Sequence, residues 1–138
     1  MVLLCGPPGA GKSTAARLSG LPVFDRDDAR WRSDAEFTMA LERVGAAAQI
    51  RAVVIRSGAT SSARAKAAHL VGATHTFVIV LPRDVLVERV QRRGRGDRVR
   101  TLAGIDRWLA RYERHDGVQD FPGWDQALAP DLGASSPW

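Results

Sequence analysis

The amino-acid sequence predicts an α/β fold in which a parallel sheet carries helices on both faces. Short, almost wholly apolar segments, typical of buried parallel strands, alternate along the chain with longer segments of helical periodicity. Polar or glycine-rich loops follow the apolar segments, and ligands of such sheets bind outside the carboxyl ends of the strands. The 138 residues suit one domain, which we expect to have a core at 1–116 and an irregular tail at 117–138.

The first elements lie close to the N-terminus. Residues 2–5 (VLLC) form an apolar strand closed by Gly6, and a helix is predicted from Lys12 to about Ser19. Residues 23–24 form a second short strand, which leads into the charged run DRDDAR. The parallel arrangement therefore brings the loops after both strands to one edge of the sheet.

A capped helix and a third strand follow. Ser33 and Glu36 have the spacing of a capping box, so a helix is predicted to begin at Ser33 and to extend to about Gln49. Its buried face is marked by Phe37, Leu41 and Val44. Residues 52–55 (AVVI) then form a strand that ends at Arg56.

The remaining elements continue the alternation. Ser61 or Ser62 is expected to cap a helix that ends at Gly72, and residues 76–81 (TFVIVL) form the clearest strand. Asp84 is expected to cap a further helix to about Arg93, and a last amphipathic helix is marked by Leu102, Ile105, Leu109 and Tyr112. From Gly117 onward there is no periodicity. Trp124 and Trp138 either fix this tail to the body or mark a partner contact.

The loop after the first strand carries the most specific motif. It satisfies G-x-x-x-x-G-K-[ST] in full and stands between a strand and a helix, as a phosphate-binding P-loop requires. Its backbone N–H groups and the helix N-terminus would bind the phosphates of ATP or another nucleoside triphosphate. Lys12 would bind the β- and γ-phosphates, and the Ser13 hydroxyl would ligate Mg²⁺, with Asp25 as a further candidate through water. The nucleotide-binding residues are thus Gly6, Pro7, Pro8, Gly9, Ala10, Gly11, Lys12, Ser13 and Thr14.

Other parts of the sequence narrow the class of P-loop protein. No acidic residue ends the third strand, where many P-loop ATPases have one, because Arg56-Ser57-Gly58 stands there. A guanine-recognition motif of the N-K-x-D kind is also absent from the sequence. These observations favour a kinase-like phosphotransferase over an ATPase or a GTPase.

Together, GPPGAGKST and the RDD-x-R segment at 26–30 resemble the 5′-polynucleotide kinase branch of small P-loop kinases. The resemblance covers roughly residues 1–114 and includes Glu88-Arg89 and Arg92-Arg93-Gly94, which are similar to the lid helix of that branch. It implies an adenylate-kinase-like architecture with a short arginine-rich lid.

The resemblance also implies roles for individual residues. Asp27 would be the general base for the attacking hydroxyl, and Arg30 would hold a phosphate of the acceptor. Arg89 and Arg93 would close over ATP and stabilise charge on the transferred phosphoryl group. The departure from the family lies after the third strand, where the family has Asp followed by Thr and this chain has Ser57 and Gly58.

That departure leaves the acceptor open. A nucleic-acid 5′ end, a modified base in DNA, a nucleoside or another small hydroxyl compound all remain candidates. Ser57 could line the acceptor pocket, or its segment could form only a turn and a helix cap. The leading hypothesis is an ATP:hydroxyl phosphotransferase acting on a nucleic acid or nucleoside. The alternatives are a nucleotide-binding or DNA-associated module with little turnover, and a kinase for a sugar or antibiotic hydroxyl.

Charge and composition constrain the partners. The net charge is +5, and the sequence contains only two lysines, so arginine supplies most of the positive charge. Such density predicts a polyanionic partner, such as ATP or nucleic acid, or else a solvated basic loop. One cysteine and no long apolar run lead us to expect a cytoplasmic protein without a membrane span, of open oligomeric state. The arginine-rich stretch contains Arg89, Arg92, Arg93, Arg95, Arg98 and Arg100.

Overall fold

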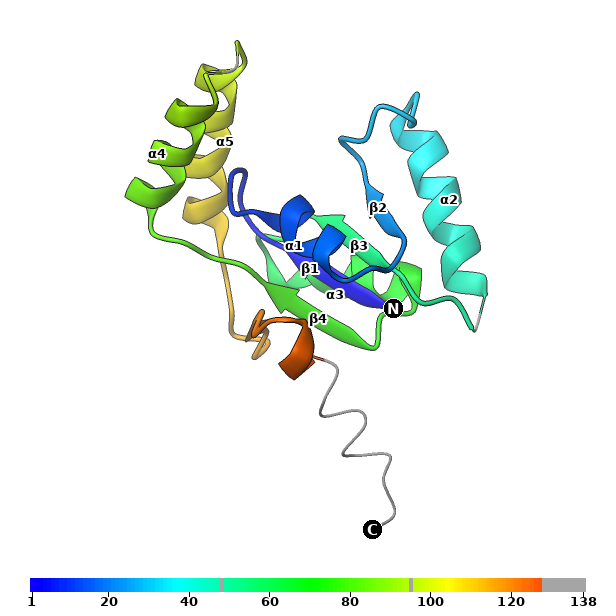
Figure 1. Cartoon of the computed structure of the whole chain (residues 1–138). Helices are drawn as coiled ribbons and strands as arrows, with labels where there is room; N and C mark the ends of the chain where they lie inside the picture. The colour runs from blue at the N-terminus through cyan, green and yellow to red at the C-terminus, as the bar shows by residue number, and fades with distance from the viewer. Residues whose placement is uncertain (48, 95, 128–138) are drawn as a thin grey trace.

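The computed structural model describes residues 1–47, 49–94 and 96–127, which form a five-stranded parallel sheet with helices on both faces (Figure 1). The predicted fold class is therefore confirmed. The strand order is β2-β3-β1-β4-β5. The strands are β1 (Val2–Cys5), β2 (Val23–Asp25), β3 (Val53–Arg56), β4 (His75–Val78) and β5 (Gln119–Asp120).

The central strand is β1, which pairs with β3 on one side and β4 on the other. Cys5, its last residue, lies in register with Arg56 and Val78, so the P-loop leaves the middle of the sheet. Strand β4 is shorter than the predicted 76–81. The N–H of Ile79 still donates to Cys5 O at 2.9 Å, but beyond this bond the chain leaves the sheet towards the next helix.

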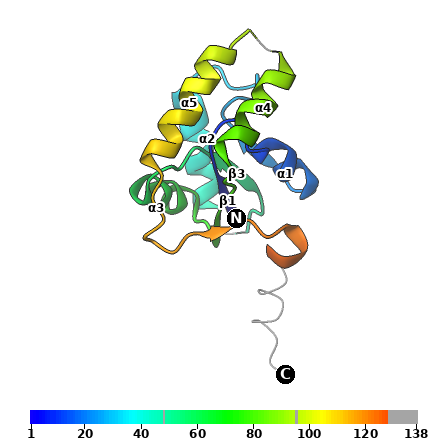
Figure 2. The same ribbon diagram turned by 90° about the vertical axis from the view of Figure 1, so that its left-hand side faces the viewer.

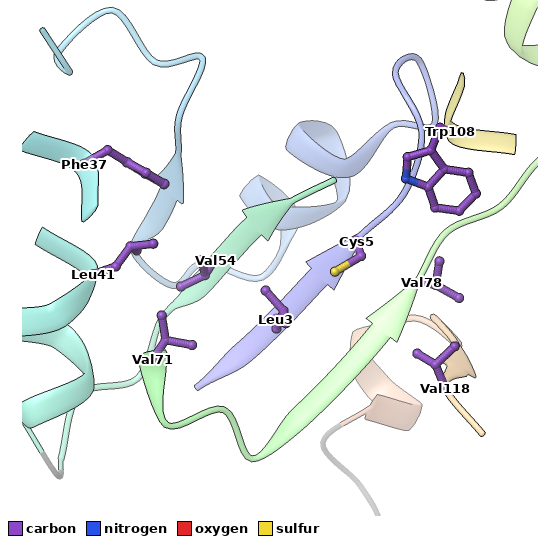
Figure 3. Packing of buried hydrophobic residues seen from close by; sticks show 9 residues of the cluster. All are labelled: Leu3, Cys5, Phe37, Leu41, Val54, Val71, Val78, Trp108 and Val118. Carbon is purple, nitrogen blue, oxygen red and sulfur yellow. The ribbon is translucent and has the colours of Figure 1, made fainter. Parts of the chain in front are cut away.

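Five helices of the described residues surround the sheet: α1 (Lys12–Leu18), α2 (Asp34–Ala46), α3 (Ser61–Val71), α4 (Arg83–Arg93) and α5 (Arg98–Arg111). Alternate residues of the buried strands pack against different helices, as expected for a sheet covered twice. Leu3 and Cys5 contact the cluster formed by α2, α3 and α5 (Figure 3). Leu4 packs on the opposite face, with Ala16 of α1. Figure 2 places α1 and α3 on opposite sides of the sheet.

The helix termini agree only in part with the predicted caps. Ser33 caps α2, since its hydroxyl accepts a hydrogen bond from Glu36 N–H at 3.1 Å. The cap of α3 is Thr60, not Ser61 or Ser62, and its hydroxyl accepts from Ala63 N–H at 3.1 Å. The cap of α4 is Pro82, and Asp84 lies instead in the first turn. There its negative charge interacts favourably with the positive end of the helix dipole, although no side-chain hydrogen bond caps the helix.

The expected irregular tail is wrong for residues 119–127. Strand β5 adds a fifth strand beside β4, and Phe121 N–H donates to Val78 O at 2.9 Å. Residues 124–127 form a helical turn, and Trp124 fixes it to the body by donating from Nε1 to Ala15 O at 2.7 Å. Two predicted residues, Arg95 and Trp138, lie outside the described residues.

One charged side chain is part of the interior. Arg64 of α3 is only 1% exposed and donates to Gly58 O at 2.9 Å and Ala59 O at 3.1 Å. It also donates to Glu113 O and forms an ion pair with Asp116 at 2.8 Å. A buried guanidinium is tolerated because its donors are satisfied in this way. Arg64 therefore joins the loop after β3 to the segment that follows α5.

No helix within the described ranges combines the length and the apolar character that crossing a bilayer requires. The thiol of Cys5 is buried in the sheet, and this burial raises its pKa to about 11 despite the nearby charges of Lys12, Arg64 and Arg56. Cys5 is thus a core residue, as the apolar strand around it predicted.

Candidate functional site

The P-loop has the backbone that anion binding requires. Gly9 and Gly11 adopt positive φ angles of 81° and 91°, a conformation that other residues rarely adopt. Gly6 passes close to β4, because a Cβ atom at Gly6 would lie 2.5 Å from Ile79 O. The loop therefore turns tightly over the end of β1 and leads directly into α1, whose N-terminus attracts negative charge.

Lys12 lies in this loop and is half-buried. Its Nζ donates to Gly6 O and to Pro7 O, the latter at 3.3 Å. Burial lowers the pKa of the ammonium group, while the negative charges of Asp25 and Asp27 act in the opposite direction. A phosphate oxygen in the loop would supply the full negative charge that these neutral carbonyls lack, as predicted for a P-loop lysine.

Ser13 and Asp25 come together from different elements. The Ser13 hydroxyl donates to Asp25 Oδ2 at 2.6 Å, and Asp25 Oδ1 accepts from Asp27 N–H at 3.1 Å. Hydroxyl and carboxylate oxygens are the ligands that Mg²⁺ prefers, and Mg²⁺ usually keeps waters and substrate phosphates as its other ligands. The donor set therefore fits Mg²⁺ brought with a nucleotide, with Asp25 close enough to act directly or through water.

A cavity of 490 Å³ lies between the P-loop and α2, and we call it the α2-side cavity. Asp27 is exposed and lines it, whereas Arg26 forms an ion pair with Asp34 at its rim. The cavity thus contains the predicted general base beside the P-loop lysine. Its lining residues also include Ser13, Asp25, Thr38, Ile55, Arg56 and Ser57.

Ser57 lies in the lining as predicted, but its contacts are made by its backbone. Ser57 O accepts from Gly6 N–H at 3.1 Å and from Trp108 Nε1 at 2.7 Å. These two bonds connect the loop after β3 to the P-loop and to α5. Ser57 therefore supports the site through its carbonyl, and the residue is exposed and lines the cavity.

Arg56, the last residue of β3, is the functional candidate that sequence reasoning passed over. It lines the α2-side cavity, and its guanidinium lies over the Phe37 ring at 5.5 Å. The signal was present, since the sequence shows Arg in the place where many P-loop ATPases have an acid. From the sequence alone, however, this position indicated only that the usual acidic residue is absent, and the arginine itself was not considered as a ligand.

Arg30 does not line the α2-side cavity. Its guanidinium donates from Nη2 to Val23 O at 2.8 Å and stacks on Trp31, 4.5 Å from the ring centroid. The side chain thus folds back on the edge of β2, so the structure does not bring it together with Asp27 as a phosphate-binding pair.

A second cavity, of 530 Å³, lies between α1 and α4, and we call it the α4-side cavity. Arg89 and Arg93 line it, as expected for lid residues, and Arg89 Nη1 donates to Gly9 O at 3.4 Å. Helices α4 and α5 form a pair that projects from the sheet next to the P-loop (Figure 1). The other lining residues are Ala10, Gly11, Thr14, Ala15, Leu18, Ile79 and Arg92.

The two cavities therefore meet at the P-loop and divide the predicted site residues between them. Thr14 and the lid arginines lie on the α4 side, whereas Asp25, Asp27 and Ser57 lie on the α2 side. Such an arrangement can hold a triphosphate across the loop with an acceptor on the far side of its terminal phosphate.

Solved structures with the same architecture are small P-loop kinases. A gluconokinase from Sinorhizobium meliloti 1021 matches with a TM-score of 0.58 and 19% identity, over 96% of this chain and 89% of its own. A sugar kinase from Janibacter sp. HTCC2649 matches with a TM-score of 0.60 and 18% identity, over 96% and 91%. A shikimate kinase from Acinetobacter baumannii, in complex with shikimate, gives 0.51 and 14%, over 97% and 93%.

At these identities the likeness establishes the fold, an adenylate-kinase-like P-loop fold, and nothing finer. No protein-family description and no curated protein sequence matches the chain. The expected resemblance to 5′-polynucleotide kinases is thus supported at the level of the P-loop kinase fold, and the finer family is not.

Proposed function

We propose that this protein is an ATP-dependent phosphotransferase that moves the γ-phosphoryl group to a hydroxyl of a small molecule. One observation carries the proposal: the P-loop lies between a cavity lined by arginines and a cavity that holds an exposed carboxylate, Asp27. A triphosphate bound in the loop has cationic groups on one side and a potential base on the other.

The proposed acceptor differs from the one that the sequence-based hypothesis favoured, since it is a small molecule and not a nucleic acid. A nucleic-acid acceptor was implied by the resemblance to 5′-polynucleotide kinases, in which Arg30 would hold a phosphate, and Arg30 packs on Trp31. The neighbours in structure are a gluconokinase, a sugar kinase and a shikimate kinase. Both observations favour the small-molecule alternative, and the α2-side cavity of 490 Å³ suits a ligand of that size.

The reaction follows from the placement of the groups. The acceptor hydroxyl lies in the α2-side cavity, where Asp27 takes its proton as the oxygen attacks the γ-phosphorus. The bond between the γ-phosphorus and the bridging oxygen breaks, and ADP leaves from the α4 side. Lys12, Arg89 and Arg93 bind the non-bridging oxygens and stabilise the charge of the transition state. Ser13 and Asp25 would hold Mg²⁺, which neutralises phosphate charge during the transfer.

The test is phosphoryl transfer from Mg-ATP to a panel of sugars, sugar acids, nucleosides and 5′-hydroxyl oligonucleotides. We expect a small-molecule product, and we expect Asp27→Asn to lower kcat by about 10²- to 10⁴-fold with little change in ATP affinity. Asp28→Asn is the matched control, because Asp28 is an exposed neighbour that does not line the cavity.

Two results would reject the proposal. Full activity in Asp27→Asn would remove the assigned base. Tight Mg-ATP binding with no product from any acceptor would instead favour a nucleotide-binding module with little turnover of its own.

A further inference from the structure

The charged groups of the α2-side cavity are unequally satisfied. Arg26 is paired with Asp34, and Asp25 accepts from Ser13 and from Asp27 N–H. Among the described residues, neither Asp27 nor Arg56 has a partner of opposite charge. One carboxylate and one guanidinium of the same cavity thus remain available to a ligand.

Arg56 is held in position although its side chain is exposed. Arg56 is the last residue of β3, and its backbone lies in register with Cys5 of the central strand. Its guanidinium rests on the ring of Phe37, which is 1% exposed and fixed in the main hydrophobic cluster. Stacking on an aromatic face leaves the N–H groups at the edge of the guanidinium free to donate in the plane.

The loop that follows Arg56 is fixed as well. Ser57 O accepts from Gly6 N–H and from Trp108, and Gly58 O accepts from the buried Arg64 at 2.9 Å. Gly58 cannot be replaced without a clash, since a Cβ atom there would lie 2.4 Å from Cys5 Sγ. Arg56 is therefore presented to the cavity by a rigid support, which lowers the entropy cost of binding.

We infer that Arg56 binds an anionic group of the acceptor, so that the substrate is a small hydroxy acid and not a neutral sugar. The inference rests on the proposed function. A planar guanidinium binds a carboxylate or a phosphate through two parallel hydrogen bonds. Asp27 lines the same cavity and would repel a second anionic group, so the group of the ligand beside Asp27 is the reacting hydroxyl.

Charge restricts the orientation of the acceptor. An anionic group of the ligand is attracted by Arg56 and repelled by the carboxylates of Asp25 and Asp27, which line the same cavity. A hydroxyl other than the acid group therefore reaches the γ-phosphate. A neutral polyol of equal length lacks this anchor, so it binds in several orientations and more weakly.

The experiment compares ligands that differ in one group. Calorimetry with Mg²⁺ and a non-hydrolysable ATP analogue measures the binding of gluconate, sorbitol and sorbitol 6-phosphate, and of shikimate and its methyl ester. We expect at least one acid to bind about 10- to 100-fold more tightly than its neutral counterpart. Tighter binding of sorbitol 6-phosphate than of gluconate would assign a phosphate as the anionic group, and the reverse a carboxylate.

Variants of Arg56 connect the preference to this residue. Arg56→Met keeps an unbranched side chain on Phe37 and should abolish the preference for the acid, whereas Arg56→Lys should restore part of it. Arg43→Met is the matched control, because Arg43 is an exposed arginine of α2 that does not line the cavity. Thermal melting of each variant establishes that it is folded.

The outcomes separate this inference from the proposed function. Equal binding of acids and neutral counterparts, a preference that persists in Arg56→Met, or no binding of any acid would overturn the inference, even if a neutral sugar were phosphorylated. Arg56-dependent binding of an acid without phosphoryl transfer would support the inference and contradict the proposed function.

Discussion

The two cavities beside the P-loop are lined by different residues of the loop and differ in charge. The α2-side cavity combines carboxylates with Lys12, Arg26 and Arg56, whereas the charged lining of the α4-side cavity, among the described residues, is arginine alone. A cavity with only cations can bind a polyanion but has no base with which to activate a hydroxyl. Under the proposed function, the comparison teaches that the fold separates the arginines for the nucleotide from the carboxylate for the acceptor, on two sides of one loop.

Lys12 lines the α2-side cavity and is the lysine of the P-loop motif, so its loss should have the largest effect. We expect Lys12→Ala to lower kcat/KM for ATP by about 100- to 1,000-fold, because a half-buried cation that contacts phosphate oxygens is removed. Steady-state kinetics and calorimetry with Mg-ATP measure this loss. Lys66→Ala, the exposed remaining lysine, should behave as the wild type. Equal Mg-ATP binding by both variants would contradict the P-loop assignment.

Arg89 and Arg93 test whether the α4 side acts on the nucleotide alone. Each change to Met should lower kcat/KM for ATP by about 10-fold, a modest loss because both side chains are exposed and their charges screened. The KM for the acceptor should change less than about two-fold, since these residues do not line the α2 side. Arg107→Met, an exposed arginine of α5, is the control. If the KM for the acceptor rises as much as the KM for ATP, the idea that the α4-side arginines act on the nucleotide alone is contradicted.

The loop after β3, which carries Ser57 of the α2-side cavity and is held by the Arg64–Asp116 pair, should be sensitive to acid. Hydrogen bonds from Arg64 hold the pKa of Asp116 below its ordinary value of 3.8, so the ionised carboxylate is favoured in the folded state. Its stabilising effect is therefore complete above pH 3.8 and is lost as the pH falls through the lowered pKa. Asp116→Asn should cost about 1 kcal/mol at pH 7, a value limited by the partial exposure of the carboxylate.

Urea unfolding at a series of pH values measures this dependence. The difference between wild type and Asp116→Asn should shrink as the pH falls below the ordinary pKa of the carboxyl. Asp125→Asn is a suitable control, since Asp125 is exposed in the turn at 124–127. A difference that stays constant down to low pH would mean that the charge of Asp116 is not what stabilises the loop.

The smallest effect is expected at Arg30. Arg30→Ala removes stacking on Trp31 and one hydrogen bond to Val23 O, which should lower stability by about 0.5 kcal/mol. The KM for the acceptor should stay within about two-fold of the wild type, because Arg30 does not line the α2-side cavity. A large rise in that KM, measured by steady-state kinetics, would indicate that Arg30 contacts the acceptor and would favour an acceptor that carries a phosphate.

Elements with strong local signals were predicted well. Runs of apolar residues marked β1 and β3, and the Ser33–Glu36 spacing marked the start of α2, because burial and capping leave direct traces in sequence. Strand β5 was missed, since Gln119 and Asp120 are exposed and carry no apolar pattern. Their pairing with β4 depends on the neighbouring packing of Phe121 and Trp124, which no local rule reveals.

The candidate site divides in the same way. The P-loop residues could be predicted from the sequence, because phosphate binding requires a contiguous motif with restricted spacing, whereas the role of Asp27 was implied by a family resemblance and stays a prediction. The contacts of Arg30 and Arg56 could not be predicted, since an arginine can face a ligand, an aromatic ring or solvent with the same local sequence. Only the packing around β2 and β3 distinguishes these cases.

The sequence by itself determined the α/β class, the phosphate-binding loop and the edge of the sheet where chemistry is to be sought. These features follow from local hydrogen bonding, backbone freedom at glycine and the alternation of apolar segments. The tertiary structure decided which charges remain unpaired. Arg64 is buried and bonds to Gly58 O and Asp116, whereas the guanidinium of Arg56 lies over Phe37 and has no partner of opposite charge among the described residues. Long-range contacts determine desolvation and pairing, so the choice of acceptor is a property of the folded chain.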